Sequence, residues 1–124
     1  MAKVNEIYKC SDCDCIVETL FDGKDKLHCS GKPMELQVEK TKEDGLAEKH
    51  KPVIEKQADG AIIKIGASPH AMEPEHYIEW VEVIEDKKLC RHSLQPGEKP
   101  EVRSYQKDHS YVRAYCNIHG LWKN

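Results

Sequence analysis

The stretch Tyr111-Val112-Arg113-Ala114-Tyr115-Cys116-Asn117-Ile118-His119-Gly120 decides the predicted fold of the C-terminal part of this chain. Its first six residues include a valine and two tyrosines, residue types that favour strands. The two-residue period of a strand puts Val112, Ala114 and Cys116 on one face. We therefore predict a strand that ends at Cys116 on its more apolar face, after which the backbone turns away at Gly120.

Other short runs upstream also predict strands. They are rich in β-branched and aromatic residues, and the dipeptides Asp59-Gly60 and Pro96-Gly97 are the expected tight turns. The runs are Val53-Ile54, residues 61–65, residues 76–84 and residues 102–105. Regular short strands of this kind predict an all-β fold, an antiparallel β-sandwich of the immunoglobulin-like kind. Helix is expected only as a turn within residues 41–49, which Gly45 weakens.

The N-terminal part has a different character. Four of the six cysteines lie at positions 10, 13, 15 and 29, and residues 10–34 carry too little apolar surface to fold without a staple. The charged stretch at residues 39–45 predicts a linker. We expect a cysteine module in residues 1–37 and a sandwich domain in residues 38–124.

Composition excludes several classes of function. With a formal net charge of -3, the chain has neither the basic surface expected of a nucleic-acid-binding protein nor a polybasic segment for membrane binding. No apolar run approaches the roughly 18 residues that span a bilayer. The N-terminus has no secretory-signal pattern, so we expect a cytoplasmic protein. In that reducing compartment, the six cysteines are expected to be metal ligands or free thiols.

A thiol and several imidazoles predict a metal site. Cys116 and His119 are close enough in sequence to share one metal ion, although this spacing also arises by chance. His70 and His76 flank a short loop, and His50 lies in a charged segment. One thiolate with several imidazoles suits iron or copper, and zinc is also compatible with these ligand types.

Three strings extend this interpretation: Glu48-Lys49-His50-Lys51-Pro52-Val53-Ile54-Glu55, His76-Tyr77-Ile78-Glu79-Trp80 and Tyr115-Cys116-Asn117-Ile118-His119-Gly120. They closely resemble superoxide reductases of the desulfoferrodoxin family. With the cysteine module, the resemblance covers essentially the whole chain. It implies a desulforedoxin-like module followed by an immunoglobulin-like sandwich.

The resemblance also implies the ligands of a catalytic, mononuclear non-haem iron. His50, His70, His76 and His119 would be equatorial ligands and the Cys116 thiolate the axial ligand. The sixth position would be open to solvent in the ferrous state. One motif departs from the family pattern His-Pro-Met, because this chain has Pro69-His70-Ala71-Met72.

The activity implied by the resemblance is one-electron reduction of superoxide to hydrogen peroxide. Lys49 would lie near the open position. Its positive charge would attract an anionic substrate locally, although the net charge of the chain is negative. Glu48 would bind the ferric iron reversibly. The resemblance further implies a rubredoxin-like electron donor and a homodimer.

The N-terminal module resembles the family less completely. Cys10-Ser11-Asp12-Cys13 is a metal knuckle, and the family completes a four-sulfur iron centre with an adjacent Cys-Cys pair. This chain has Cys29-Ser30 at that place. Either the centre is absent, or it holds iron or zinc with three thiolates and a further ligand. The candidates for that fourth ligand are Cys15, His28 and Ser30.

Two other classes of protein compete with the reductase. A blue-copper electron carrier also combines a β-sandwich with a late Cys and His, but such sites use an axial Met, and none follows His119. A zinc-stabilised interaction module is the second rival. We expect Cys90 to be a partly buried free thiol, His92 a surface residue and His109 a loop residue.

Overall fold

The computed structural model describes residues 2–43 and 45–124. The chain divides into two compact units, Met1–Val38 and Glu39–Asn124. Strands dominate both units, and the one helix in the described residues is the four-residue α1 (Ala47–His50). Over those same residues, no helix has the length and apolarity needed to cross a bilayer.

The first unit is built from very short strands: β1 (Ile7–Lys9), β2 (Ile16–Glu18), β3 (His28–Cys29), β4 (Lys32–Pro33) and β5 (Glu35–Leu36). They form an antiparallel sheet of order β2-β1-β5 and a separate β3-β4 hairpin. Ile7 and Tyr8 are buried, but Leu20 and Phe21 are 82% and 84% exposed. This small core agrees with the expectation that the unit needs a cross-link, such as a bound metal ion, to fold stably.

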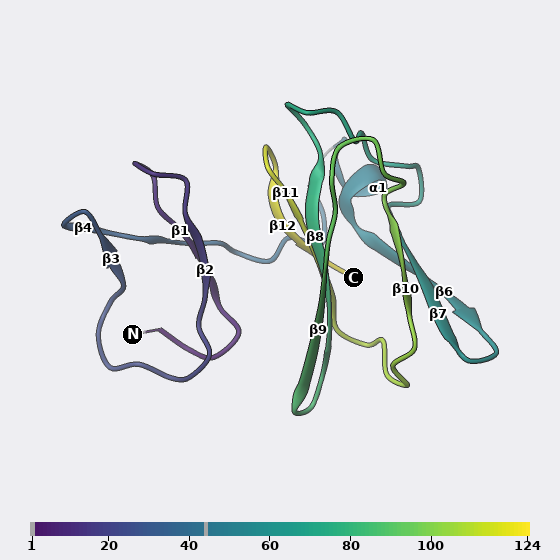
Figure 1. The fold of residues 1–124 in the computed structure, drawn as a ribbon, viewed down its shortest axis with the longest axis horizontal. Coiled ribbons are helices and arrows are strands. Elements are labelled where there is room, and N and C mark those ends of the chain that lie inside the picture. The colour runs from purple at the N-terminus through teal and green to yellow at the C-terminus, as the bar shows by residue number, and fades with distance from the viewer. Residues whose placement is uncertain (1, 44) are drawn as a thin grey trace. The chain divides into compact units, whose positions relative to one another are not determined.

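The second unit is an antiparallel sandwich, as predicted. Its strands are β6 (Pro52–Gln57), β7 (Gly60–Ile65), β8 (Ile78–Glu85), β9 (Lys88–Ser93), β10 (Glu101–Ser104), β11 (Val112–Cys116) and β12 (Gly120–Lys123). They form a sheet of order β10-β7-β6 and a sheet of order β12-β11-β8-β9 (Figure 1). All the strand pairs in both sheets are antiparallel.

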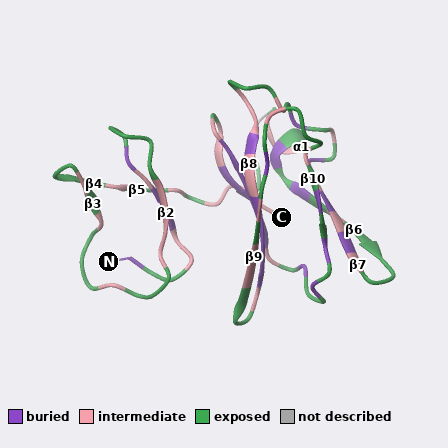
Figure 2. Ribbon diagram, in the orientation of Figure 1, coloured by how far each residue is buried: buried purple, intermediate pink, exposed green. Residues whose placement is uncertain are grey.

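The two sheets share one hydrophobic core. It is made of inward-facing residues of both sheets: Ile63, Ile65, Ile78, Val81, Val83, Leu94, Val102, Val112, Ala114 and Cys116. Figure 2 shows this burial along β8 and β7. The predicted apolar face of the last long strand is thus confirmed. Its opposite face is buried as well, since Arg113 is 2% exposed and its Nε donates to the Glu82 carboxylate at 3.0 Å.

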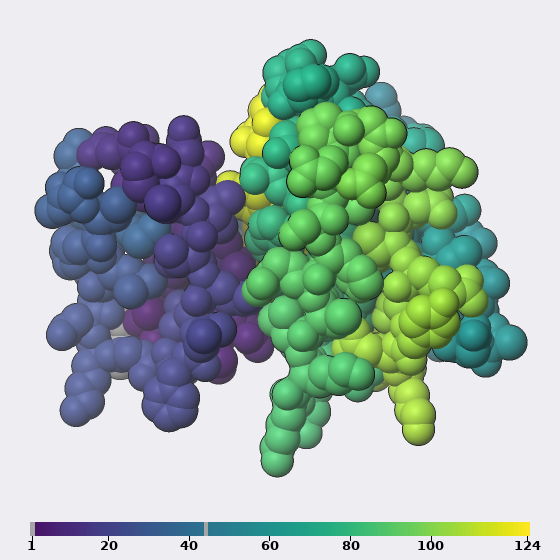
Figure 3. Space-filling view, in the orientation of Figure 1, coloured from purple at the N-terminus to yellow at the C-terminus, as the bar shows by residue number. Residues whose placement is uncertain are grey.

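Two strands of the second unit were absent from the prediction. In β9, charged and polar residues are exposed or half-buried, so the apolar alternation that identifies a strand is missing. Figure 3 shows β9 and the segment leading to β10 on the surface. The four-residue β12 follows directly from the turn at Gly120, where the sequence indicated only a change of direction.

The helical turn lies at the end of the segment where it was expected. It comprises only Ala47–His50, and Lys51 is already extended, with ψ of 122°. The residue before a proline disfavours the helical region, so Pro52 sets this boundary. The helix therefore ends at His50. The turn at Pro96-Gly97 is confirmed, and the β6–β7 hairpin turns at Ala58-Asp59, immediately before Gly60.

Candidate metal centre

The five predicted ligands come from different parts of the second unit. His50 ends α1, while His70 and His76 lie in the connection between β7 and β8. Cys116 ends β11, and His119 is in the turn between β11 and β12. Possible ligand atoms of His50, His70, His76 and Cys116 all lie within 4.8 Å of one another. His119 joins them, because its Nδ1 is 3.8 Å from the Cys116 sulfur.

The four imidazole rings form a closed cycle in which each ring contacts two of the others. Neighbouring ring centres are 4.5 Å apart for His50 and His70, and 4.7 Å for His70 and His76. They are 5.2 Å apart for His76 and His119, and 4.8 Å for His119 and His50. Each neighbouring pair is steeply inclined, at 68° to 85°. The diagonal from His50 to His76 is longer, 6.4 Å.

The tautomers of two histidines show that a cation fits among them. His50 Nδ1 lies 2.8 Å from the Leu46 carbonyl oxygen, and His70 Nδ1 lies 2.6 Å from that of Ala71. A carbonyl oxygen only accepts, so both Nδ1 atoms carry protons and both Nε2 atoms present lone pairs. Those Nε2 atoms are 3.0 Å apart, and the buried His76 Nε2 has no hydrogen-bond partner. A metal ion satisfies all these lone pairs at once.

Burial keeps two of the imidazoles in the form that binds metal. It lowers the pKa of His70 from 6.5 to about 4, and it also lowers the pKa of His50. Both side chains are almost fully buried, with 4% and 2% exposure. His50 and His70 are therefore neutral near pH 7, and their nitrogen lone pairs are available to a metal ion.

The sulfur of Cys116 is buried but accepts hydrogen bonds. Burial raises the pKa of its thiol, while bonds from the backbone N–H groups of His119 and Ile118 oppose that rise. The His119 nitrogen is 3.3 Å from the sulfur. These donors stabilise a thiolate, which is the form that ligates a metal. This sulfur and the four imidazoles would together supply five ligands to a metal ion.

Three residues that position the ligands were missed in the sequence. Asn117 accepts from the Tyr77 N–H at 2.9 Å and donates to the Glu75 carbonyl at 3.0 Å, which ties the turn of His119 to the segment around His76. The position of Asn117 between Cys116 and His119 in the sequence could have indicated this role. The other two, Lys40 and Trp122, both donate to the His119 carbonyl, a contact that no local pattern reveals.

Glu48 and Lys49 have exposed side chains on α1, directly before the buried His50. Their backbone is anchored, because the Glu48 carbonyl accepts from the Ser68 N–H at 3.2 Å. Gly66 packs against this backbone so closely that a Cβ there would lie 2.6 Å from the Glu48 carbonyl oxygen. The two charged side chains thus extend from a fixed main chain.

A second group of possible ligands lies in the first unit. Sulfur atoms of Cys10, Cys13 and Cys29 lie within 4.8 Å of one another, and those of Cys13 and Cys29 are 3.4 Å apart. The Asp14 N–H donates to the Cys10 carbonyl at 3.2 Å, and Asp14 has a φ of 61°, as a tight knuckle requires. The backbone hydrogen bond from Cys15 is the main cause that lowers the pKa of Cys13 to about 7.

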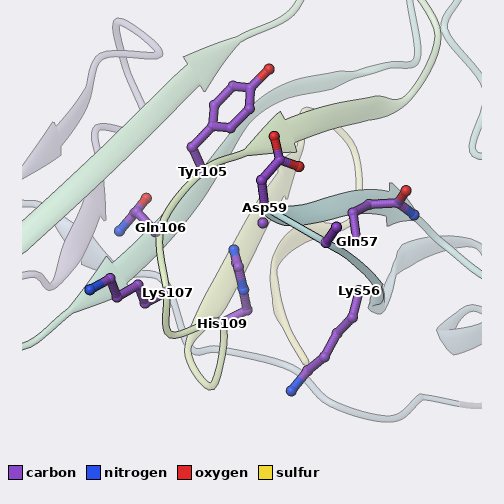
Figure 4. Close-up of a pocket in the computed structure, with 9 residues that line it drawn as sticks. Lys56, Gln57, Asp59, Tyr105, Gln106, Lys107 and His109 are labelled. Atoms are coloured by element: carbon purple, nitrogen blue, oxygen red, sulfur yellow. The ribbon is translucent and has the colours of Figure 1, made fainter.

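Cys90, His92 and His109 belong to neither group. Cys90 is half-buried, as expected, but His92 is also half-buried and lies with its Nε2 3.8 Å from the Cys90 sulfur. His109 is in a loop, as expected, and contacts the Ser104 hydroxyl at 3.0 Å. It lines a hollow of about 400 Å³ together with Lys56 and Gln106, shown in Figure 4. None of the predicted ligands lines this hollow.

Comparison with known families assigns the whole chain. Residues 42–124 match the desulfoferrodoxin model, and residues 2–37 match the model of the desulfoferrodoxin N-terminal domain. The chain belongs to the desulfoferrodoxin family. The family resemblance and the two-part layout of an N-terminal desulforedoxin-like module and a sandwich are thereby confirmed. The two groups of ligands match the iron centre and second metal site expected for this family.

Individual relatives agree with this family assignment. A desulfoferrodoxin of Syntrophotalea carbinolica is 48% identical over 129 residues, covering 100% of this chain and 98% of the relative. A superoxide reductase of Thermococcus kodakarensis is 33% identical over 101 residues, covering 65% of this chain and 88% of the relative. The crystal structure of the superoxide reductase from Treponema pallidum has a TM-score of 0.78 at 23% identity, covering 100% of this chain and 99% of that one, which is a likeness of fold.

Proposed function

We propose that this desulfoferrodoxin is a superoxide reductase whose iron is held by His50, His70, His76, His119 and Cys116. The closed cycle of four imidazoles beside one buried thiol carries the proposal. Blue-copper sites use two imidazoles, one thiolate and a weak axial ligand, and structural zinc sites use four ligands. The five strong donors of this site are more than a blue-copper or a structural zinc site uses. They suit a six-coordinate iron with one exchangeable position.

The reaction is the addition of one electron and two protons to superoxide, which gives hydrogen peroxide. An iron ion held by the four histidines and Cys116 would supply the one-electron chemistry. The Cys116 thiolate would donate electron density to that ion, a property by which thiolate ligands tune iron sites. The neutral His50 and His70 rings hold their orientation through the carbonyl groups of Leu46 and Ala71.

We assign Lys49 to substrate attraction. Superoxide is an anion and the chain carries a net charge of -3, so an ammonium beside the ligand His50 gives the local attraction that the whole molecule lacks. Its exposure leaves the charge free to meet a diffusing anion. Glu48, the exposed carboxylate on the other side of Lys49, is proposed as a reversible ligand of the ferric state.

The wider setting is part of the same proposal. A small rubredoxin-like carrier would return the electron to the iron, and the protein would act as a homodimer. A cytoplasmic location fits six unpaired thiols, because that compartment keeps thiols reduced. The division between the module and the catalytic domain is placed near residue 38, where the two compact units meet in sequence.

Metal analysis and product stoichiometry test the proposal together. The purified chain should contain iron in its second unit and show a visible band after oxidation, and Cys116→Ser should abolish that band. With excess reductant, each superoxide consumed should yield one hydrogen peroxide and no dioxygen. Copper would instead support the electron carrier, zinc alone would support an interaction module, and release of dioxygen would indicate dismutation.

A further inference from the structure

The first unit holds an incomplete metal site. Cys10, Cys13 and Cys29 bring three sulfur atoms within 4.8 Å of one another. Thiophilic ions such as zinc take four ligands in structural sites, at about 2.3 Å for sulfur. The small core of this unit, with Leu20 and Phe21 exposed, also needs a staple of this kind. A fourth ligand must therefore come from a nearby residue or from solvent.

Two of the three candidates are poorly suited. The Ser30 hydroxyl is 4.0 Å from the Cys29 sulfur, and a neutral hydroxyl is a much weaker ligand for a thiophilic ion than a thiolate. His28 is exposed, with its Nδ1 3.1 Å from the Lys26 carbonyl oxygen. Its ring nitrogens, like the sulfur of Cys15, lie outside the group of clustered ligand atoms.

Cys15 is better placed by the geometry of the backbone. The pairing of Lys9 with Ile16 continues one step to Cys10 and Cys15, whose backbones are joined by a hydrogen bond of 2.9 Å from the Cys10 N–H. Residues opposed in an antiparallel ladder have side chains about 5 Å apart. In agreement with this placement, interaction with the Cys13 thiol is the main cause that raises the pKa of the Cys15 thiol.

We propose that Cys15 is the fourth ligand, so that Cys10, Cys13, Cys15 and Cys29 bind one zinc or iron ion through four sulfur atoms. The side chain of Cys15 is exposed, so no packing holds it away from the ion. All four sulfurs bind as thiolates, and the protons pass to solvent as the ion enters. The site thus keeps a complete sulfur set although Ser30 stands beside Cys29. This proposal does not depend on the activity of the second unit.

Protection from alkylation tests the ligand directly. The full-length chain, with iron in its second unit, is loaded with Zn²⁺ and exposed briefly to iodoacetamide, and each cysteine is then followed by mass spectrometry. Cys15 should be protected together with Cys10, Cys13 and Cys29, and chelation of the zinc should remove that protection. Cys90, which is remote in sequence, serves as the internal reference. Alkylation of Cys15 at the same rate with and without zinc would overturn the proposal.

A matched pair of variants separates Cys15 from Ser30. Because Cys15 is exposed, Cys15→Ser should leave the fold intact and weaken zinc binding by at least about tenfold, measured by competition with a chromophoric chelator. Ser30→Ala should leave the affinity unchanged. The reverse pattern, a loss in Ser30→Ala with none in Cys15→Ser, would make the hydroxyl the ligand and overturn the proposal. Failure of the first unit of the wild-type chain to bind either zinc or iron would overturn it as well.

Discussion

The Lys40 ammonium donates a hydrogen bond of 3.0 Å to the backbone carbonyl of His119. The indole N–H of Trp122 donates to the same oxygen at 3.2 Å, and the indole stacks on His50 with ring centres 4.9 Å apart. Lys40 also lies 5.7 Å from the centre of the Trp122 ring. A positive charge is thus held beside two ligands of the metal centre.

Removal of this charge should lower the reduction potential of the iron. A nearby cation favours the ferrous form, which carries one positive charge fewer than the ferric form. Lys40→Met should therefore lower the potential by roughly 20–60 mV, where about 59 mV corresponds to a tenfold change in a one-electron equilibrium. Redox titration of the visible band measures the shift, and the band itself should change in energy.

Glu43 provides the control for Lys40. Its carboxylate lies 3.2 Å from the Lys40 ammonium, so Glu43→Gln removes a neighbouring charge while the lysine stays in place. The potential of this variant should not fall. Equal decreases in both variants would mean that the effect is not due to the Lys40 cation.

Asn117 should control how well the metal is held. Its side chain links the Tyr77 N–H to the Glu75 carbonyl, so Asn117→Ala releases the segment of His76 from the turn of His119. We expect a loss of about 1–3 kcal/mol in the free energy of unfolding and faster loss of iron to a chelator. Urea denaturation and the rate of iron release measure the two effects.

Asn124 is a matched control for Asn117. It also joins two backbone segments, by accepting from the Val112 N–H and donating to the His109 carbonyl, but Val112 lies at the opposite end of β11 from Cys116. Asn124→Ala should cost comparable stability without faster release of iron. If both variants release iron equally fast, the effect follows from general loosening of the fold.

The sequence was most informative where local chemistry determines structure. The alternation around Val112 and Ala114 identified both the strand and its apolar face, because a strand with one face in the core must repeat every second residue. The ligands could be named because thiol and imidazole groups have few alternative uses in combination. Family resemblance supplied their grouping, which spacing alone left open.

The sequence was least informative where tertiary contacts determine structure. β9 was missed because its exposed charged residues hide the period, and pairing with β8 defines it instead. The roles of Lys40 and Trp122 depend on a bridge between residues distant in the chain. The fourth ligand of the first unit was likewise open, because the backbone hydrogen bond between Cys10 and Cys15 appears only in three dimensions.

If the proposed function holds, Lys49 should accelerate the reaction of the protein with superoxide. Lys49→Ile removes the exposed cation next to His50, so the second-order rate constant should fall by roughly tenfold and depend less on ionic strength. Pulse radiolysis at several salt concentrations gives both quantities. Lys56→Ile removes an equal charge from exposed β6 and should leave the rate near that of wild type. An unchanged rate in Lys49→Ile would remove its role in attraction.

Buried histidines should make the metal-free chain unstable in acid. Burial lowers the pKa of His70 to about 4, below the value of 6.5 in the unfolded chain. Between these values the unfolded state binds more protons, so the associated stability is present above pH 6.5 and is lost as the pH falls towards 4. The loss for His70 should reach about 3 kcal/mol. Urea denaturation across this range should show a shallower pH dependence in His70→Gln.

Gly66 should be essential for placing His50, because a side chain there has no space. A Cβ at Gly66 would lie 2.6 Å from the Glu48 carbonyl oxygen and 2.9 Å from the Lys49 carbonyl carbon. These are backbone atoms of the segment that ends in His50, so they cannot rotate away as a flexible side chain would. Gly66→Ala should therefore cost about 1–3 kcal/mol of stability and move His50 relative to the other ligands.

Urea denaturation and the energy of the oxidised visible band measure these two consequences of Gly66→Ala. Gly23→Ala is the control, because no atom lies within 4 Å of a Cβ at that position. It should change neither quantity. A Gly66→Ala chain with normal stability and an unchanged band would show that the backbone of residues 48–51 yields without disturbing the metal centre. Lys49 would then extend from a main chain less rigid than its contacts with β7 and the following loop indicate.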